Sequence, residues 1–198
     1  MRKHSFCTFC GKQADTREHV FARCFFDKPH PSNMFTVPSC HKCNQSFSSD
    51  EQYLMYLIDY LKSIESNDGD FTRNKAKSTF IHNDNLEDRM INSIQVFNRD
   101  TVFVLESERI ERVVKKTAKC LYRYCFNQIL PYDRIECNWA FASQLSEEQL
   151  RRIATIPFVP LQANTVKYYY SHEEIGYCLS EFFYAVVRVS HSKTASPL

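Results

Sequence analysis

Two Cys-x-x-Cys pairs constrain this chain of 198 residues more than any other feature of its sequence. The pairs are Cys7-Thr-Phe-Cys10 and Cys40-His-Lys-Cys43, with 29 residues between them. Four thiolates are enough to close a tetrahedral Zn2+ site, and Gly11 tolerates the unusual backbone angles of the tight turn that the first pair forms. We therefore predict a structural zinc ion on these four cysteines. A redox dithiol is the alternative, but it belongs in a βαβ unit, and this sequence shows none.

The total of nine cysteines argues against a secreted disulfide scaffold, because the count is odd and the chain is long. The first residues, MRKHSFC, lack the apolar segment of a signal peptide, and the longest apolar runs are too short to span a bilayer. We therefore expect a reduced, cytoplasmic protein without a membrane partner. The other five cysteines are expected to be small buried hydrophobic residues: Cys24, Cys120, Cys125, Cys137 and Cys178.

The composition is that of a folded protein with modest charge. Hydrophobic residues make up 43% of the chain and aromatic residues 14%, which is enough to fill a core. The net charge is only +2, so any binding to nucleic acid must depend on local basic patches.

Hydrophobic periodicity divides the chain into two regions. Apolar residues recur at helical spacing over 51–64, and the polar stretch 65–79 predicts a loop at a domain boundary. Beyond it we expect helices at 86–97, 108–128 and 146–154, the last opened by a capping box, and strands at 102–105, 137–141, 165–170 and 182–189. The predicted fold class is α+β: a zinc-braced module at 1–64, a mixed domain of helices and antiparallel strands at 80–190, and a frayed tail at 191–198.

Between the cysteine pairs, Glu18 and His19 place a carboxylate beside an imidazole, and Asn44 directly follows the second pair. Together with Gly11 and the four cysteines, these residues resemble the HNH endonucleases of the ββα-metal (treble-clef) class, in the subgroup braced by two zinc knuckles. The resemblance covers about the first 55 residues. It implies that Glu18 and Asn44 bind one catalytic Mg2+ or Mn2+ and that His19 activates the attacking water. Asn33 is the nearest candidate for the asparagine that orients the histidine in that family.

The chemistry of phosphodiester hydrolysis suits such a set of residues. A divalent metal neutralises the phosphate and the leaving oxygen, and a base with a pKa near 6.5 activates water. Neighbours on an ideal strand point to opposite faces, so Glu18 and His19 can share a site only where their strand ends or bends. Glu51, on the following helix, is a weaker candidate for supporting the site, because acidic residues there also suit the helix dipole.

On the helix predicted at 108–128, a row of basic residues lies beside the apolar stripe: Arg112, Lys115, Lys116, Lys119 and Arg123. One interpretation is a surface that contacts phosphates, and the other is an ordinary solvated face. Residues 113–124, followed by 130–133, also resemble the C-terminal extensions of bacterial HNH proteins found among phage-defence genes. The aromatic residues at 168–170 and 182–184 fit a half-buried sheet better than a base-stacking surface.

The expected function is therefore metal-dependent cleavage of DNA, with RNA not excluded and with a role in antiviral defence implied by the resemblance. Two alternatives remain open. One is a non-catalytic zinc module that binds nucleic acid or a protein and needs neither Glu18 nor His19. The other is a nuclease subunit that is active only in a complex with a sensor or ATPase partner.

Overall fold

A short antiparallel hairpin followed by two helices begins the fold. The computed structural model describes residues 6–65, 94–97, 100–162 and 165–190. Strand β1 (Thr16–His19) pairs with β2 (Thr36–Ser39), and the 3-10 helix η1 (Arg23–Phe25) lies between them. Helix α1 (His41–Gln45) comes directly after β2, and the long helix α2 (Ser48–Glu65) follows it. This order of elements places both cysteine pairs at one end of the hairpin.

A second antiparallel hairpin leads into the longest helix. Strands β3 (Ile94–Phe97) and β4 (Asp100–Phe103) pair with each other, and α5 spans Ser107–Phe126. The helix predicted at 86–97 is wrong for residues 94–97, which form β3, and residues 86–93 lie outside the described part of the chain. The first three residues of Ile-Gln-Val-Phe alternate between apolar and polar, and this alternation is typical of a strand.

Residues 135–189 form an antiparallel sheet of five strands in the order β5-β9-β8-β7-β6. The strands are β5 (Ile135–Phe141), β6 (Val159–Gln162), β7 (Val166–Tyr170), β8 (Glu174–Leu179) and β9 (Phe183–Val189). Short 3-10 helices η2 (Tyr132–Arg134) and η3 (Ala142–Gln144) flank β5. Helix α6 (Glu147–Ala154) begins at the predicted capping box, in which Ser146 and Gln149 bond to each other's backbone N–H groups. All neighbouring strands pair antiparallel, so the predicted class of α+β with antiparallel strands is confirmed.

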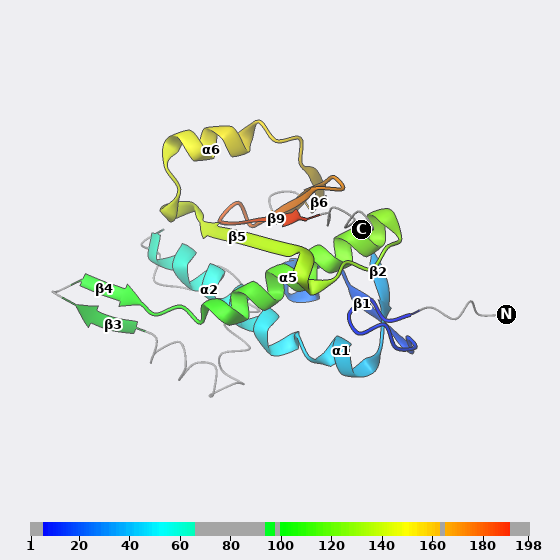
Figure 1. The fold of residues 1–198 in the computed structure, drawn as a ribbon. Coiled ribbons are helices and arrows are strands. Elements are labelled where there is room, and N and C mark those ends of the chain that lie inside the picture. Colours follow the sequence, from blue (N-terminus) through cyan, green and yellow to red (C-terminus); the bar gives the residue numbers. More distant parts are fainter. Residues whose placement is uncertain (1–5, 66–93, 98–99, 163–164, 191–198) are drawn as a thin grey trace, which may run out of the picture.

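Helix α5 crosses the middle of the molecule, with the sheet on one side and the hairpin β1–β2 and α2 on the other (Figure 1). Its residues Ile110, Val113, Val114 and Leu121 are fully buried. They belong to one hydrophobic cluster that also takes in residues from η1, α2 and the sheet. The two regions distinguished in the sequence therefore share a core.

Phe21 shows this sharing most directly. It follows β1, and its ring centroid lies 5.6 Å from that of Tyr177 on β8 and 6.0 Å from that of Tyr168 on β7. The loop expected at 65–79 and the tail at 191–198 lie outside the described residues, except for Glu65 at the end of α2. Among the helices that the structure describes, none combines the length and the apolar character needed to cross a bilayer.

Candidate functional site

The four cysteines predicted to bind zinc come together in the structure. Their sulfur atoms all lie within 4.8 Å of one another, and Sγ of Cys10 is 3.8 Å from Sγ of Cys40. Zinc–sulfur bonds of about 2.3 Å in a tetrahedron separate the sulfurs by roughly 3.8 Å. Cys7, Cys10, Cys40 and Cys43 could therefore hold a structural zinc ion, as the sequence predicts.

A backbone turn at the first pair and the start of α1 at the second bring the cysteines to this point. Gly11 has a φ of 70°, the left-handed region that favours glycine, and its N–H donates to the Cys7 carbonyl at 3.0 Å. The N–H and the hydroxyl of Thr8 both donate to the carbonyl of Pro38 on β2, at 3.0 and 2.8 Å. This contact fixes the first turn beside the end of β2, where Cys40 begins α1.

The polypeptide around Cys7 favours its thiolate form. Burial raises the pKa of the Cys7 thiol, but the backbone N–H groups of Cys10, Cys40 and Phe9 outweigh burial and lower the pKa to about 6. Thiolate is the form that binds metal, and N–H groups pointing at sulfur are what a tight Cys-x-x-Cys turn provides. The donor set and its surroundings both fit Zn2+.

The acid–histidine pair lies at the C-terminal end of β1, and Asn44 of α1 contacts the first two residues of that strand. Glu18 is 6% exposed, and His19 is half-buried as the last residue of the strand. The side-chain amide of Asn44 donates to the carbonyl of Arg17 at 2.9 Å, one residue before Glu18. Glu18 and His19 thus lie on β1, and Asn44 contacts the same strand two residues or more before His19.

A lysine from the second half of the chain reaches this strand end. Nζ of Lys116 lies 3.1 Å from Oε1 of Glu18 and 2.8 Å from Oε1 of Glu51 on α2, and it donates to the carbonyl of His19 at 2.6 Å. Lys116 is completely buried. Oε2 of Glu18 is also buried, and it has no hydrogen-bond partner among the described residues.

Burial and charge set the protonation of this group. Burial by itself would lower the pKa of Lys116, but the carboxylates of Glu51 and Glu18 raise it above its ordinary value, so the lysine stays charged. Burial raises the pKa of Glu18, and Lys116 opposes that change.

His19 is affected in the opposite direction from Lys116. Burial lowers the pKa of His19 below 6.5, and the positive charges of Arg23 and Lys116 lower it further. The charge of His30 acts in the same direction, so His30, which no sequence pattern placed at the site, lies near His19. His19 is therefore a neutral imidazole at pH 7, the form that can accept a proton.

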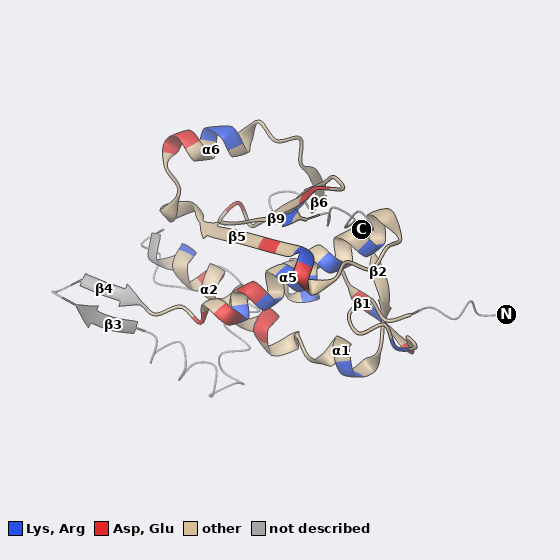
Figure 2. Ribbon diagram, viewed as in Figure 1, with Lys and Arg blue, Asp and Glu red and all other residues tan. Residues whose placement is uncertain are grey.

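The basic row on α5 is not a continuous exposed stripe. Lys116 and Lys119 are 0% and 2% exposed, so the expectation that they face solvent is wrong. Lys119 lies over the ring of Tyr132, 3.5 Å from its centroid, and such a cation–π contact compensates for lost hydration. The acidic residues of α5, Glu108 and Glu111, lie in its first two turns, and basic residues alone follow as far as Arg123 (red and blue in Figure 2).

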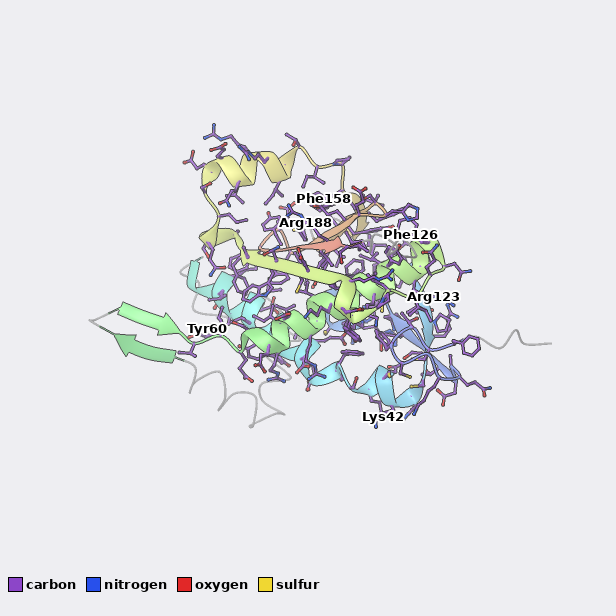
Figure 3. The ribbon with its side chains drawn as sticks, in the orientation of Figure 1. Lys42, Tyr60, Arg123, Phe126, Phe158 and Arg188 are labelled. Carbon is purple, nitrogen blue, oxygen red and sulfur yellow. The ribbon has the colours of Figure 1, made fainter. Side chains whose placement is uncertain are left out.

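Arg112, Lys115 and Arg123 remain more accessible than the two buried lysines, and each has a partner. Arg112 pairs with Asp50 at 2.9 Å, and Lys115 pairs with Glu111. Arg123, labelled near the C-terminal end of α5 in Figure 3, donates to the carbonyl of Asn127 at 2.8 Å. These three residues keep enough exposure to meet a phosphate.

The remaining predicted site residue lies apart. Asn33 is exposed in a turn three residues before β2, and in the described part of the chain no hydrogen bond joins it to His19. Lys116 and Glu51 lie closer to the end of β1 than the sequence predicts: Lys116 contacts Glu18 and the carbonyl of His19, and Glu51 contacts Lys116. Glu51 could be weakly predicted, because it lies about two helical turns after Asn44 in the sequence. Nothing in the local sequence distinguishes Lys116 from the lysines beside it.

Comparison with known proteins does not assign this site to a family. No protein-family model, no curated protein sequence and no solved structure matches the chain. What the chain does is therefore inferred from its residues and their geometry.

Proposed function

We propose that this chain is an endonuclease of the HNH (treble-clef) type that hydrolyses DNA phosphodiester bonds. One observation carries the proposal: Glu18 and His19 end β1, and the side-chain amide of Asn44 bonds to the same strand beside a four-cysteine cluster. The Asn44 amide bonds to β1 at 2.9 Å, and Cys43 immediately precedes Asn44 on α1, so zinc binding would fix the position of Asn44 as well.

His19 is the base in this proposal. It takes a proton from a water molecule, the water oxygen attacks the phosphorus atom, and the bond to the 3′-oxygen of the leaving strand breaks. Its lowered pKa supports the role, because a histidine that is neutral at pH 7 has a free lone pair. Its position as the last residue of β1 lets it turn away from the regular strand alternation.

Glu18 and Asn44 would hold the catalytic Mg2+ or Mn2+. Their donors fit such an ion: Oε2 of Glu18 lacks a hydrogen-bond partner, and Asn44 uses its NH2 group on β1, which leaves its side-chain oxygen as a ligand. The metal would supply positive charge to the phosphate and to the leaving oxygen. Arg112, Lys115 and Arg123 would add contacts to the phosphate backbone.

A cleavage assay tests the proposal. The zinc-loaded protein is incubated with supercoiled DNA, single-stranded DNA or RNA, each with Mg2+, Mn2+ or EDTA. We expect metal-dependent cleavage of DNA, and His19→Ala should reduce the rate at least about a hundredfold, the usual scale for loss of a general base. His41→Ala is the matched control. His41 is exposed on α1, and its backbone N–H, which alanine keeps, donates to Asp15. Equal cleavage by the parent and His19→Ala would contradict the proposal.

One observation favours a non-catalytic zinc module as the second candidate. Glu18 is buried and paired with Lys116, an arrangement that also serves structure alone. That candidate predicts no cleavage under any condition and unchanged binding of nucleic acid or protein in His19→Ala. A subunit that needs a sensor or ATPase partner is distinguished from it by cleavage that appears only in the assembly and still depends on His19.

A further inference from the structure

The ammonium group of Lys116 lies where three elements meet. Lys116 comes from α5, Glu51 from α2 and Glu18 from β1, and no part of the lysine is exposed. Besides its contacts with the two carboxylates, it donates to the carbonyls of His19 at 2.6 Å and Val20 at 3.4 Å. One buried cation thus contacts two carboxylates and the end of the strand that carries His19.

The charges in this group do not cancel. When Glu18 and Glu51 are both ionised, one ammonium and two carboxylates carry a net charge of −1, and a buried charge costs free energy unless it is compensated. A purely structural ion pair would need only one carboxylate for one lysine. The excess negative charge points to a further cation.

The geometry indicates which carboxylate carries that excess. Lys116 is closer to Glu51, at 2.8 Å, than to Glu18, at 3.1 Å. Lys116 contacts only Oε1 of Glu18, and Oε2 is buried without a hydrogen-bond partner. Glu51 is thus the closer partner of Lys116, and Glu18 keeps one oxygen that Lys116 does not contact.

We infer that Glu51 and Lys116 form a positioning pair that orients Glu18 and preserves its charge for a divalent cation. This inference rests on the proposed function, because the cation is the one assigned there to Glu18. Glu51 acts through Lys116 and does not itself touch the metal.

Binding of Mn2+ to the zinc-loaded protein tests the inference without any substrate. Free Mn2+ is measured by its electron paramagnetic resonance signal at pH 7.5. Glu51→Gln keeps the shape of the side chain and removes its charge, so Lys116 then neutralises Glu18, and we expect the Kd for Mn2+ to rise at least about tenfold. Glu51→Asp keeps the charge and should stay within about threefold of the parent.

A matched control removes a carboxylate from a lysine pair on the exposed face of α5. Glu111→Gln changes the net charge of the protein by the same amount but acts on the Glu111–Lys115 pair. It should leave Mn2+ binding within about twofold of the parent, because solvent screens a distant surface charge. Glu51→Gln leaves a neutral Lys116–Glu18 pair, so its melting temperature should remain close to that of the parent.

The outcomes separate the inference from the proposed function. Unchanged Mn2+ binding in Glu51→Gln, equal losses in Glu51→Gln and Glu51→Asp, or no Mn2+ binding by the parent would each overturn the inference. Mn2+ binding that depends on Glu51 and is lost in Glu18→Gln, together with no cleavage of any nucleic acid, would support the inference and contradict the nuclease proposal.

Discussion

His19 is the residue whose surroundings bear most directly on function. It ends β1, it is half-buried, and the charges near it from Arg23, His30 and Lys116 are positive when these groups are protonated. Glu51 is the acidic group that opposes them. Burial and these cations disfavour the protonated ring, so the pKa of His19 lies below its ordinary value.

The rate of cleavage should therefore fall with acid only below the ordinary pKa of histidine. As pH decreases through the lowered pKa of His19, the base becomes protonated and cleavage is lost, so the midpoint of the acid limb should lie below 6.5. Arg23→Gln removes a positive charge and should move this midpoint to higher pH. Single-turnover rates between pH 5 and 8 at saturating Mn2+ measure both effects. An acid limb at or above 6.5 in the parent would contradict the assignment of His19.

The sequence predicts some residues of this site and not others for a physical reason. The cysteine pairs, the Glu18–His19 neighbours and Asn44 after Cys43 are recognisable because their meaning depends on local spacing. Lys116 is not, because its partners, Glu18 and Glu51, are far from it in sequence and meet it only after folding. A basic residue in a helix is predicted to be exposed, because lysine and arginine are rarely buried without a partner and a partner distant in sequence is not visible in the local pattern.

At the scale of elements, α5 shows that the span of a helix can be predicted correctly while the exposure of its side chains is predicted wrongly. The predicted span of 108–128 agrees closely with Ser107–Phe126. However, α5 is covered on two sides, by α2 and β2 and by the sheet, so the side of the helix that carries Lys116 and Lys119 is buried as well. An amphipathic pattern specifies one covered side, and it does not specify a second one.

Two adjacent lysines on α5 should thus differ sharply in their effect on stability. Lys116→Ala leaves the buried carboxylates of Glu18 and Glu51 facing each other unpaired, and we expect a loss of about 3–5 kcal/mol in the free energy of unfolding. Lys115→Ala removes a partly exposed pair and should cost about 0–1 kcal/mol. Urea unfolding followed by circular dichroism measures both. Similar losses in the two variants would contradict the buried ion-pair cluster.

The strands that sequence patterns missed have a similar explanation. Strand β8 contains Gly176, which weakens a strand pattern. In the sheet Gly176 is paired with Tyr169, and a Cβ at position 176 would lie only 2.0 Å from a carbon of the Tyr169 ring. The glycine is thus required by an aromatic ring on the neighbouring strand, a contact that the sequence of β8 alone does not contain.

At the scale of the whole molecule, the cysteine cluster and the five-stranded sheet are connected through shared packing. Phe21 contacts Tyr168 and Tyr177, and Lys116 of α5 is bonded to the end of β1. The sequence predicts the zinc module and the mixed region separately, because each has its own local pattern. Their common core depends on contacts between residues that are far apart in the sequence, which local patterns do not report.

Removal of zinc should therefore affect more than the first 60 residues. Structural zinc sites contribute folding free energy directly, and a small module with little core of its own depends on its metal. Since the residues beside the cysteine cluster pack on α5 and the sheet, we expect loss of zinc to unfold both regions in one transition. Trp139, the only tryptophan of the chain, lies on β5 of the distant sheet and reports on that region through its fluorescence.

The measurement compares zinc release, followed with a chromogenic chelator, with Trp139 fluorescence during a titration with a strong chelator. The two signals should coincide, and the purified, reduced protein should contain one zinc ion per chain. Cys40→Ser should lose zinc and unfold readily, whereas Cys125→Ser should keep both zinc and fold, because Cys125 is half-buried near the end of α5 outside the cluster. Protein without zinc, or a Trp139 signal that persists after zinc is released, would show that the sheet is stable without the metal and that the shared core does not couple the two regions.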